Sequence, residues 1–458
     1  MSRGLLVIFL TLGCSSRLQS PSVTPSVSTL SAVDSMAAAA LRERKTPGLS
    51  LVVLQGDNTL LARGYGFADP EHQVPVAATT VFQLGSISKQ MLGALVLRLA
   101  ERGLLSLDDP VTRHLPEFSR LPTEIRVRHL LNHTSGIREP FTMPEYQAGI
   151  EDLSRSSGEL AVILRQAPVD FVPASRWSYS NANYLILALL IERVTGRPYE
   201  RSLADELFRP LGLHSLRHCT PLPQDTGEAR GHVLRDGTVA PAAPENMNWI
   251  RGDGGLCGNA LDVARWTRLL ASGRVVTPLS YKVMSAPTRI EGSREADYGF
   301  GLSLVTLDGR RKVAHNGAML GFSASAAYYP ESGFTVVVLT NRGDVRSESI
   351  ERGIARRLLG LPTPNLRERV LLREEKRRFE GRYDIGPFPV NVVERGGQLW
   401  LEMPPPGPTT ALRYLGDGEF ACETDSDACR LTFSAGDAPA NELRLFMGAM
   451  HWYGVRSP

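Results

Sequence analysis

The chain has 458 residues, of which 42% are hydrophobic and 22% are charged, as in ordinary soluble globular proteins. This length predicts two or three domains and leaves ample chain for a large hydrophobic core. The 51 basic and 48 acidic residues give a net charge of only +3, so composition gives no argument for nucleic acid or an anionic membrane as a partner.

The first twenty residues are typical of an export signal. A basic residue precedes an apolar run over residues 5–12, which is too short to span a bilayer but fits the core of a signal peptide. Gly13 before Cys14 indicates a bacterial lipoprotein cleavage site with a lipid anchor at Cys14, although Thr11 stands where a branched aliphatic residue is usual. A plain signal cleaved near residue 20 is the other interpretation. Both predict export, to the periplasm, to the outer membrane as a lipoprotein, or out of the cell.

Residues 21–34 are rich in Ser, Thr, Pro and Val and are expected to form a flexible tether. Strands are then predicted at 49–54 and 59–64 around a Gly-Asp-Asn turn. Helices follow at 86–100, 183–195 and 260–272, the last opening with an Asn N-cap and an acid three residues on. Strands return at 313–316, 322–329 and 334–340, before a helix at 346–359. Strands at both ends with helices between predict one mixed sheet in an α/β or α+β domain over 35–360.

A Pro-rich and then charge-dense stretch, 361–378, is expected to be a linker. Residues 379–458 contain short aromatic and β-branched runs split by Gly and Pro, which predicts a small antiparallel β-barrel or sandwich. Cys422 and Cys429 flank a polar turn there and could form a disulfide across a hairpin. The sequence does not decide whether Cys219 and Cys257 pair or stay free.

Ser86 and Lys89 are the first pair of residues in the chain whose types and spacing are suited to catalysis. Residues three apart on a helix are neighbours, roughly 5–6 Å apart at Cβ, so the Lys89 amine can reach the Ser86 hydroxyl. Serine is a weak nucleophile unless such a base activates it. Residues 91–100 are apolar almost all round, which predicts a buried helix and a lowered pKa for Lys89. Alone, the pair also fits an ordinary serine N-cap with a solvated lysine.

Two further segments, Tyr179-Ser180-Asn181 and His315-Asn316-Gly317, complete a set of three. Taken singly, they fit a plain turn and a half-buried strand histidine. In the order S-x-x-K, Y-x-N, H-x-G they resemble the serine β-lactamase and penicillin-binding protein superfamily, closest to its class C-like branch of β-lactamases, D-Ala-D-Ala carboxypeptidases, D-aminopeptidases and esterases. The resemblance covers about residues 35–360, including the flanks 128–136 and 254–256. It implies a β-lactamase/transpeptidase-like antiparallel sheet flanked by helices, with an all-helical subdomain.

Together, these residue types can carry out acyl transfer. Ser86 attacks a carbonyl, Lys89 and Tyr179 share the proton, and Asn181 can hydrogen-bond both Lys89 and the substrate's amide. Lys89 and His315 are expected to lower the pKa of Tyr179. The resemblance implies that the backbone amides of Ser86 and Ala318 hold the oxyanion and that Tyr179 activates the deacylating water.

The third motif departs from the family pattern. Asn316 stands where a threonine hydroxyl usually helps to hold a substrate carboxylate, while Gly317 leaves room for substrate along the strand edge. His315 replaces a permanent cation with a group that titrates near ~6.5, so activity is predicted to depend on its protonation.

Metal chemistry has weaker support. His129 and His133 are four apart, but no glutamate follows His129 as a zinc metalloprotease requires, so a plain helix end is favoured. A site at His214, His218 and Cys219 has only proximity in its favour. No cofactor or metal is expected.

The sequence therefore predicts an exported serine hydrolase that acts on a β-lactam, a D-amino-acid peptide or an ester. The alternative is a penicillin- or peptidoglycan-binding sensor that acylates without turnover; a scaffold without chemistry is disfavoured by the intact Ser86, Lys89, Tyr179 and Asn181. The C-terminal segment 379–458, which opens with Phe379-Glu380-Gly381-Arg382-Tyr383, resembles the lipocalin-like modules that are often attached to this family.

Overall fold

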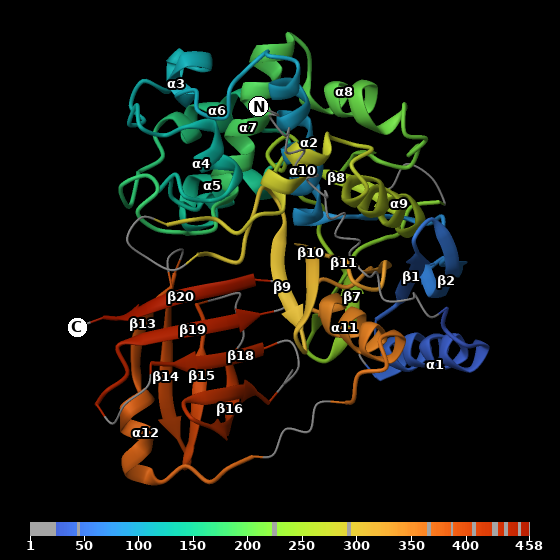
Figure 1. Cartoon of the computed structure of the whole chain (residues 1–458), viewed down its shortest axis with the longest axis vertical. Helices are drawn as coiled ribbons and strands as arrows, with labels where there is room; N and C mark the ends of the chain where they lie inside the picture. Colours follow the sequence, from blue (N-terminus) through green and yellow to red (C-terminus); the bar gives the residue numbers. More distant parts are fainter. Residues whose placement is uncertain are drawn as a thin grey trace, which may run out of the picture.

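The computed structural model describes residues 24–43, 46–221, 227–290, 295–363, 368–385, 388–404, 409–423, 429–434, 438–447 and 450–457. A mixed domain of helices and sheet is followed by a closed barrel (Figure 1). The lipidation site predicted at Cys14 and the export signal lie outside the described residues. Within the described part of the chain, no helix is long and apolar enough to cross a membrane.

The first domain is built on a seven-stranded antiparallel sheet in the order β3-β2-β1-β12-β11-β10-β9. Its strands are β1 (Gly48–Gln55), β2 (Asn58–Asp69), β3 (Val74–Pro75), β9 (Ser303–Leu307), β10 (Arg310–Met319), β11 (Phe322–Tyr329) and β12 (Phe334–Thr340). Leu49 of β1 lies opposite Thr340 of β12, so the chain leaves the sheet and rejoins it beside its first strand. This confirms the single sheet expected from the sequence.

Both faces of the central strands are buried, which explains why their sequences are nearly continuous apolar runs. Leu51 and Val338 belong to one buried cluster, while their neighbours Val52 and Val337 belong to the other. The first cluster is covered by α1 (Val27–Glu43) and α11 (Ser347–Leu358), and the second by α9 (Ala260–Ala271). Alternate residues along each strand therefore serve opposite faces of the sheet.

The helical region packs around α2 (Ser88–Glu101) and α7 (Asn181–Thr195), which contact each other. The other described helices here are α3 (Val111–His114), α4 (Val127–Leu131), α5 (Pro144–Glu151), α6 (Ser157–Arg165), α8 (Tyr199–Leu203) and α10 (Pro278–Met284). A 3-10 turn, η1 (Gly85–Ile87), leads into α2. Two small sheets complete the domain: β4 (Val81–Gln83), β8 (Leu256–Asn259) and β5 (Arg217–His218), and the hairpin β6 (His232–Arg235) and β7 (Thr238–Pro241).

The tether expected over 21–34 is wrong from Val27 onward, because α1 begins there. Val33 and Ala37 on α1 are fully buried against the sheet. Asp34 accepts hydrogen bonds from Tyr65 and Arg63 of β2, at 2.6 and 2.7 Å. Local composition favoured a flexible segment, but these tertiary contacts hold it as a helix.

The C-terminal region forms a closed antiparallel barrel. Its strands are β13 (Gly381–Asp384), β14 (Pro389–Arg395), β15 (Gln398–Glu402), β16 (Thr409–Gly416), β17 (Glu419–Cys422), β18 (Cys429–Phe433), β19 (Glu442–Met447) and β20 (Met450–Arg456). Helix α12 (Arg373–Phe379) covers the end of the predicted linker and the first residue of the predicted β domain, Phe379, whose side chain is buried in the barrel core. The Cys422–Cys429 disulfide joins β17 and β18 as expected, and Cys219 is paired with Cys257.

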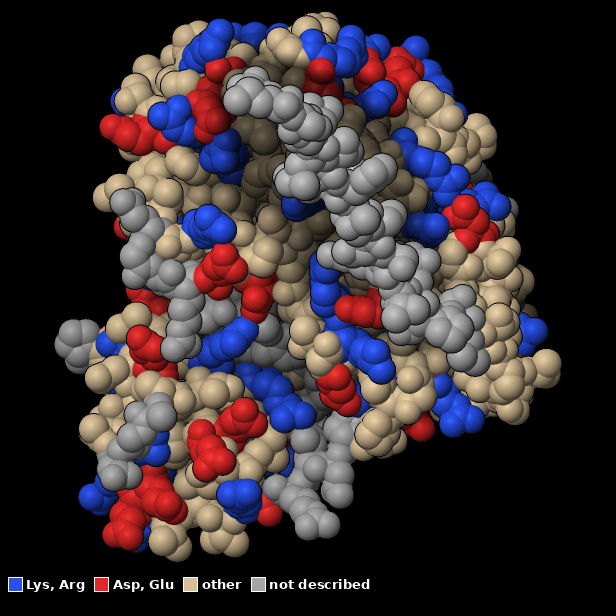
Figure 2. Space-filling model, viewed as in Figure 1, with Lys and Arg blue, Asp and Glu red and all other residues tan. Residues whose placement is uncertain are grey.

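The barrel docks against the first domain beside β9 and β10 (Figure 1). Trp177 of the first domain packs on the core cluster of the barrel. Arg444 of β19 forms an ion pair with Asp297 at 2.6 Å, and Arg176 approaches Asp384 at 4.0 Å. Acidic and basic side chains are interspersed over the face seen in Figure 2, as the near-neutral composition predicts.

Candidate active site

The three sequence motifs converge at one place. Ser86 lies in η1, and Lys89 occupies the first turn of α2. Lys89 Nζ is 3.0 Å from Ser86 Oγ and 2.7 Å from Asn181 Oδ1, although Asn181 is 92 residues further along the chain. The Nζ atom also donates to the backbone oxygen of Asp253 at 2.5 Å. Ser86 and Lys89 are thus joined by a direct hydrogen bond.

Lys89 is fully buried, as its place on an apolar helix predicts. Burial lowers its pKa to about 8, against the opposing influence of the Asp253 and Glu139 carboxylates. A substantial fraction of the amine is therefore neutral near pH 8. A neutral amine can take the proton of a serine hydroxyl, which an ammonium cannot do.

Asn181 begins α7 and is held by the carboxylate of Glu139, a half-buried residue that the sequence did not single out. Glu139 Oε2 accepts the backbone N–H of Asn181 at 2.6 Å, and Glu139 Oε1 accepts its Nδ2–H at 3.1 Å. The backbone N–H of Phe141 also donates to Oε1, at 3.1 Å. Burial raises the pKa of Glu139, while these donors and Lys89 act in the opposite direction.

Tyr179 lies next to this group, with Lys89 Nζ 4.9 Å from the centre of its ring. Its pKa is raised well above 10, first by burial and also by the Glu139 and Asp253 carboxylates. The expected lowering of this pKa by Lys89 and His315 is therefore wrong. The Ser86 hydroxyl is close enough to oppose the shift, but the two hydroxyls do not meet the geometry of a hydrogen bond. The phenol stays protonated and is a proton donor.

His315 lies on β10 with its ring 6.4 Å from that of Tyr179. Its Nε2 is 2.9 Å from the Tyr298 hydroxyl, and its Nδ1 is 2.6 Å from the backbone oxygen of Asn316. Burial and the charge of Lys89 lower the pKa of His315 to about 3. The ring is therefore neutral throughout the physiological range, which argues against the predicted dependence of activity on His315 protonation.

The backbone of β10 passes directly beside η1. A Cβ atom on Gly317 would lie 1.9 Å from Leu84 O and 3.1 Å from Ser86 N, and one on Gly85 would lie 2.7 Å from Ala318 N. Both positions therefore need glycine, and Gly85 also has a positive φ of 53°. This close approach brings the backbone nitrogens of Ser86 and Ala318 near each other, and an oxyanion hole needs two such N–H donors.

One edge of β10 is left for a ligand. The pairing of β10 with β9 ends at Ala314, opposite Ser303, whereas its pairing with β11 continues to Met319. Within the described residues, no strand of the sheet runs along the outer edge of the backbone from His315 to Ala318. Asn316 is half-buried and Ala318 is exposed on this stretch. An extended substrate could add there as a short strand.

His133 supports the site rather than a metal. Its Nδ1 atom accepts hydrogen bonds from the Ser180 amide at 3.2 Å and from Asn183 Nδ2 at 3.0 Å. Its ring centre is 4.3 Å from that of Tyr179. The backbone of His133 has a positive φ of 60°, a conformation that is uncommon for residues other than glycine.

Three functional neighbours had no visible signal in the sequence. Glu139 has no fixed spacing from the other motifs, and Tyr298 lies in an irregular segment before β9. Asp253 precedes the Gly254-Gly255 flank, but it contacts Lys89 through its backbone oxygen, which any residue could supply. Only the folded structure reveals these contacts.

The described chain offers little for a metal ion. Asp69, Glu71 and His72 lie close enough to share one, but Asp69 is already paired with Arg230 at 2.6 Å and with His72. Cys219 is in a disulfide, and His218 Nδ1 is 2.8 Å from the Tyr199 hydroxyl, so the arrangement considered at 214–219 does not form.

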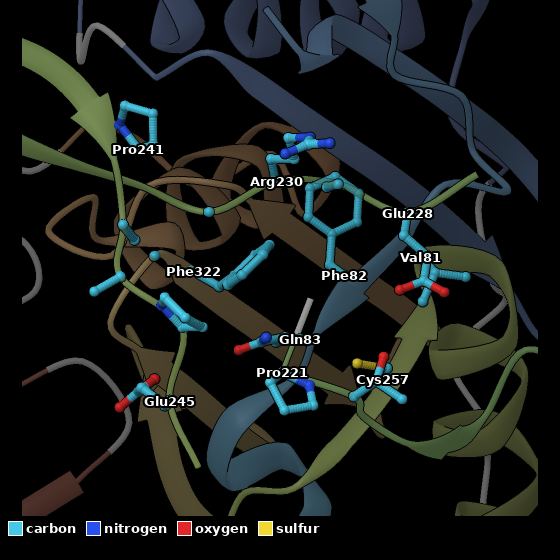
Figure 3. A pocket seen from close by; sticks show the side chains of 17 residues that line it. Val81, Phe82, Gln83, Pro221, Glu228, Arg230, Pro241, Glu245, Cys257 and Phe322 are labelled. Carbon is cyan, nitrogen blue, oxygen red and sulfur yellow. The ribbon is translucent and has the colours of Figure 1, made fainter. Parts of the chain in front are cut away.

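A pocket beside β4 is distinct from the Ser86 site. It has a volume of about 90 Å³ and is lined by apolar side chains such as Phe82 and Phe322 (Figure 3). Its charged side chains have partners elsewhere: Glu228 pairs with Arg217, Arg230 with Asp69, and Glu245 accepts the Leu320 amide. Its described lining contains no nucleophile–base pair.

Comparison with known proteins agrees with this geometry. The sequence model of the Beta-lactamase family matches residues 33–360, so the chain belongs to the beta-lactamase family. PbpX of Bacillus subtilis (strain 168), which carries the name of a penicillin-binding protein, is 30% identical over 302 residues, covering 65% of this chain and 71% of that relative. A D-aminopeptidase of Brucella anthropi is 28% identical over 300 residues, covering 65% of this chain and 56% of the relative.

The similarity in fold to solved structures also covers the barrel. The octameric penicillin-binding protein homologue of Pyrococcus abyssi superposes with a TM-score of 0.67 over 93% of this chain and 99% of its own, at 24% identity. Identity at this level shows the fold alone. The chain thus has the β-lactamase/transpeptidase fold with an appended eight-stranded barrel, in a family whose members are serine hydrolases.

Proposed function

We propose that the protein is a serine hydrolase that forms an acyl-enzyme on Ser86 and acts on a D-amino-acid amide or peptide with a free amino end, or on a small ester. The observation that carries this proposal is the contact between Lys89 Nζ and Ser86 Oγ, with the Lys89 pKa lowered to about 8. It places a buried, partly neutral base on the hydroxyl of a serine.

The third motif favours this substrate class over β-lactams and peptides that end in a carboxylate. His315 is neutral, and both of its ring nitrogens are engaged by Tyr298 and Asn316. Asn316 also replaces the usual threonine hydroxyl. The motif therefore supplies no cation for a substrate carboxylate. The similarity to a D-aminopeptidase points in the same direction.

The proposed steps follow from which groups of the site carry a proton before the reaction. Neutral Lys89 takes the Ser86 proton as Oγ bonds to the carbonyl carbon, and the oxyanion is held by the Ser86 and Ala318 amides. Tyr179 gives its proton to the leaving group as the carbonyl re-forms, and Lys89 returns a proton to Tyr179. Water then attacks the acyl-enzyme, its proton passes toward the Tyr179–Lys89 pair, and Ser86 regains its own.

We also propose that the protein is exported. The apolar run over residues 5–12 and the disulfide Cys219–Cys257 support an oxidising compartment. Fractionation of the producing cells tests this, since a cytosolic product with intact residues 1–20 would contradict it.

One panel of substrates tests the enzymatic proposal. The purified protein is incubated separately with D-alanine amide, p-nitrophenyl acetate, nitrocefin and an N-acylated D-Ala-D-Ala peptide, while turnover and intact mass are recorded. We expect turnover of the amide or the acetate, and little of the two carboxylate substrates. Preferential nitrocefin hydrolysis would contradict the substrate class, and a stable adduct without turnover would instead establish the sensor.

A further inference from the structure

Both carboxylate oxygens of Glu139 accept hydrogen bonds from Asn181. Each of its carboxylate oxygens already accepts one backbone N–H, from Asn181 and from Phe141. The same Oε1 also accepts the side-chain Nδ2–H of Asn181 at 3.1 Å. A carboxylate can only accept, so the Asn181 amide must turn its nitrogen toward Glu139 and its oxygen toward Lys89.

This orientation decides where the Lys89 lone pair points. Among the described residues, Lys89 Nζ is within hydrogen-bond distance of Asn181 Oδ1 at 2.7 Å, Asp253 O at 2.5 Å and Ser86 Oγ at 3.0 Å. The first two are pure acceptors, so a neutral amine gives one N–H to each. The remaining position carries the lone pair, and it faces Ser86.

We propose that Glu139 is a positioning residue, which fixes the Asn181 amide with its oxygen toward Lys89 and so aims the lone pair of Lys89 at the Ser86 hydroxyl. The proposal rests on the proposed function, because it assigns Lys89 the role of base. With Asn181 reversed, its Nδ2–H would draw the lone pair of Lys89 to itself. An N–H of Lys89 would then face Ser86, and the hydroxyl would lose its proton acceptor.

Glu139 also acts on Lys89 through its charge. The titratable or aromatic groups around Lys89 come from several elements: Glu139, Asp253, His133, His315, Tyr179 and Tyr184. Among them, the carboxylates of Asp253 and Glu139 raise the pKa of Lys89. Loss of the Glu139 charge should therefore lower the pH at which Lys89 becomes neutral.

The test compares acylation by p-nitrophenyl acetate, which carries no amine, in E139Q, N181D and the double variant. In E139Q a donor replaces one acceptor beside Asn181, so we expect acylation about 100-fold slower and its pH midpoint shifted below that of the wild type. N181D alone is also slow, because two carboxylates face each other. In the double variant either oxygen of the carboxylate introduced by N181D accepts from Lys89, so we expect a recovery of about tenfold over E139Q.

E245Q is the matched control. It removes the charge of another half-buried carboxylate near Asp253 and keeps an acceptor for the Leu320 amide, so its rate and midpoint should match those of the wild type. Thermal unfolding of every variant shows whether a loss of activity comes from a loss of folding or from a changed orientation of the Asn181 amide. NMR titration of the Lys89 side chain with ¹³C-labelled lysine reads the midpoint without turnover. That reading separates failure of this proposal from failure of the proposed function.

Three results would overturn the proposal. E139Q could keep the wild-type rate and midpoint. It could slow only D-alanine amide, which would make Glu139 a binding group for the substrate ammonium. It could also lose activity with an unchanged midpoint and no recovery in the double variant, which would make Glu139 an ordinary structural residue.

Discussion

Proton positions at the candidate site are set by burial more than by neighbouring charges. Burial lowers the pKa of Lys89 to about 8 and that of His315 to about 3, and raises that of Tyr179 above its usual range. The spacing of Ser86 and Lys89 and their buried helix could be read from the sequence. The directions for Tyr179 and His315 could not, because the depth of each side chain depends on contacts between distant segments.

These shifts predict the pH dependence of catalysis. Lys89 must be neutral to accept the Ser86 proton, so kcat/KM should rise through the Lys89 pKa of about 8 and level off at higher pH. Tyr179 remains protonated in this range and adds no second limb near neutrality. A pH profile of kcat/KM for p-nitrophenyl acetate measures this.

The variant H315N checks the assignment of that limb. It should change the height of the profile but not its midpoint, because His315 is neutral throughout. A limb near pH 6.5 that disappears in H315N would show that His315 titrates after all.

At the scale of elements, the site depends on the contact between β10 and η1. The sequence predicted a strand at 313–316, whereas β10 runs from Arg310 to Met319. In the sequence, the apolar pair Val313-Ala314 is followed by polar His315-Asn316 and then Gly317, so no strand pattern continues to where β10 meets η1. The glycine itself is explained by the 1.9 Å that would separate its Cβ from Leu84 O.

The variant G317A tests this contact. The added methyl group must push β10 away from η1, which displaces the Ala318 amide from the oxyanion position. We expect kcat to fall about 100-fold, with a lower melting temperature.

G353A is its control. Gly353 lies inside α11, where a new Cβ meets only the flexible end of Met36 at 3.4 Å. This change should leave activity intact and stabilise the protein by about 0.5–1 kcal/mol. If G317A were as active as G353A, the oxyanion site would not depend on the contact between β10 and η1.

At the scale of the whole molecule, the barrel is docked on segments that lead into the site. Trp177 packs on the barrel core and lies two residues before Tyr179, while Asp297 pairs with Arg444 and precedes Tyr298. The sequence separated the two regions, and the short aromatic and β-branched runs of 379–458 predicted a β domain. It could not show this docking, because a single tryptophan between two domains has no repeating pattern.

Trp177→Ala should therefore affect both regions. We expect a loss on the order of 2 kcal/mol in unfolding free energy and a lower kcat, because the Trp177 ring also packs against Tyr298 at 5.7 Å between centres. Denaturant unfolding and steady-state kinetics of the full chain measure these effects. R444A, which breaks a half-exposed ion pair, should cost no more than about 1 kcal/mol. A Trp177→Ala protein as stable as the wild type would mean that the barrel does not depend on this contact.

The hydrolase assignment is tested most directly by trapping the acetyl-enzyme after rapid mixing with p-nitrophenyl acetate and mapping the modified peptide. We expect the acetyl group on Ser86, none in S86A, and formation slowed by about 10²–10⁴-fold in K89M without a lower melting temperature at pH 7. An adduct on another residue, or an S86A protein that still acylates and turns over, would contradict the account.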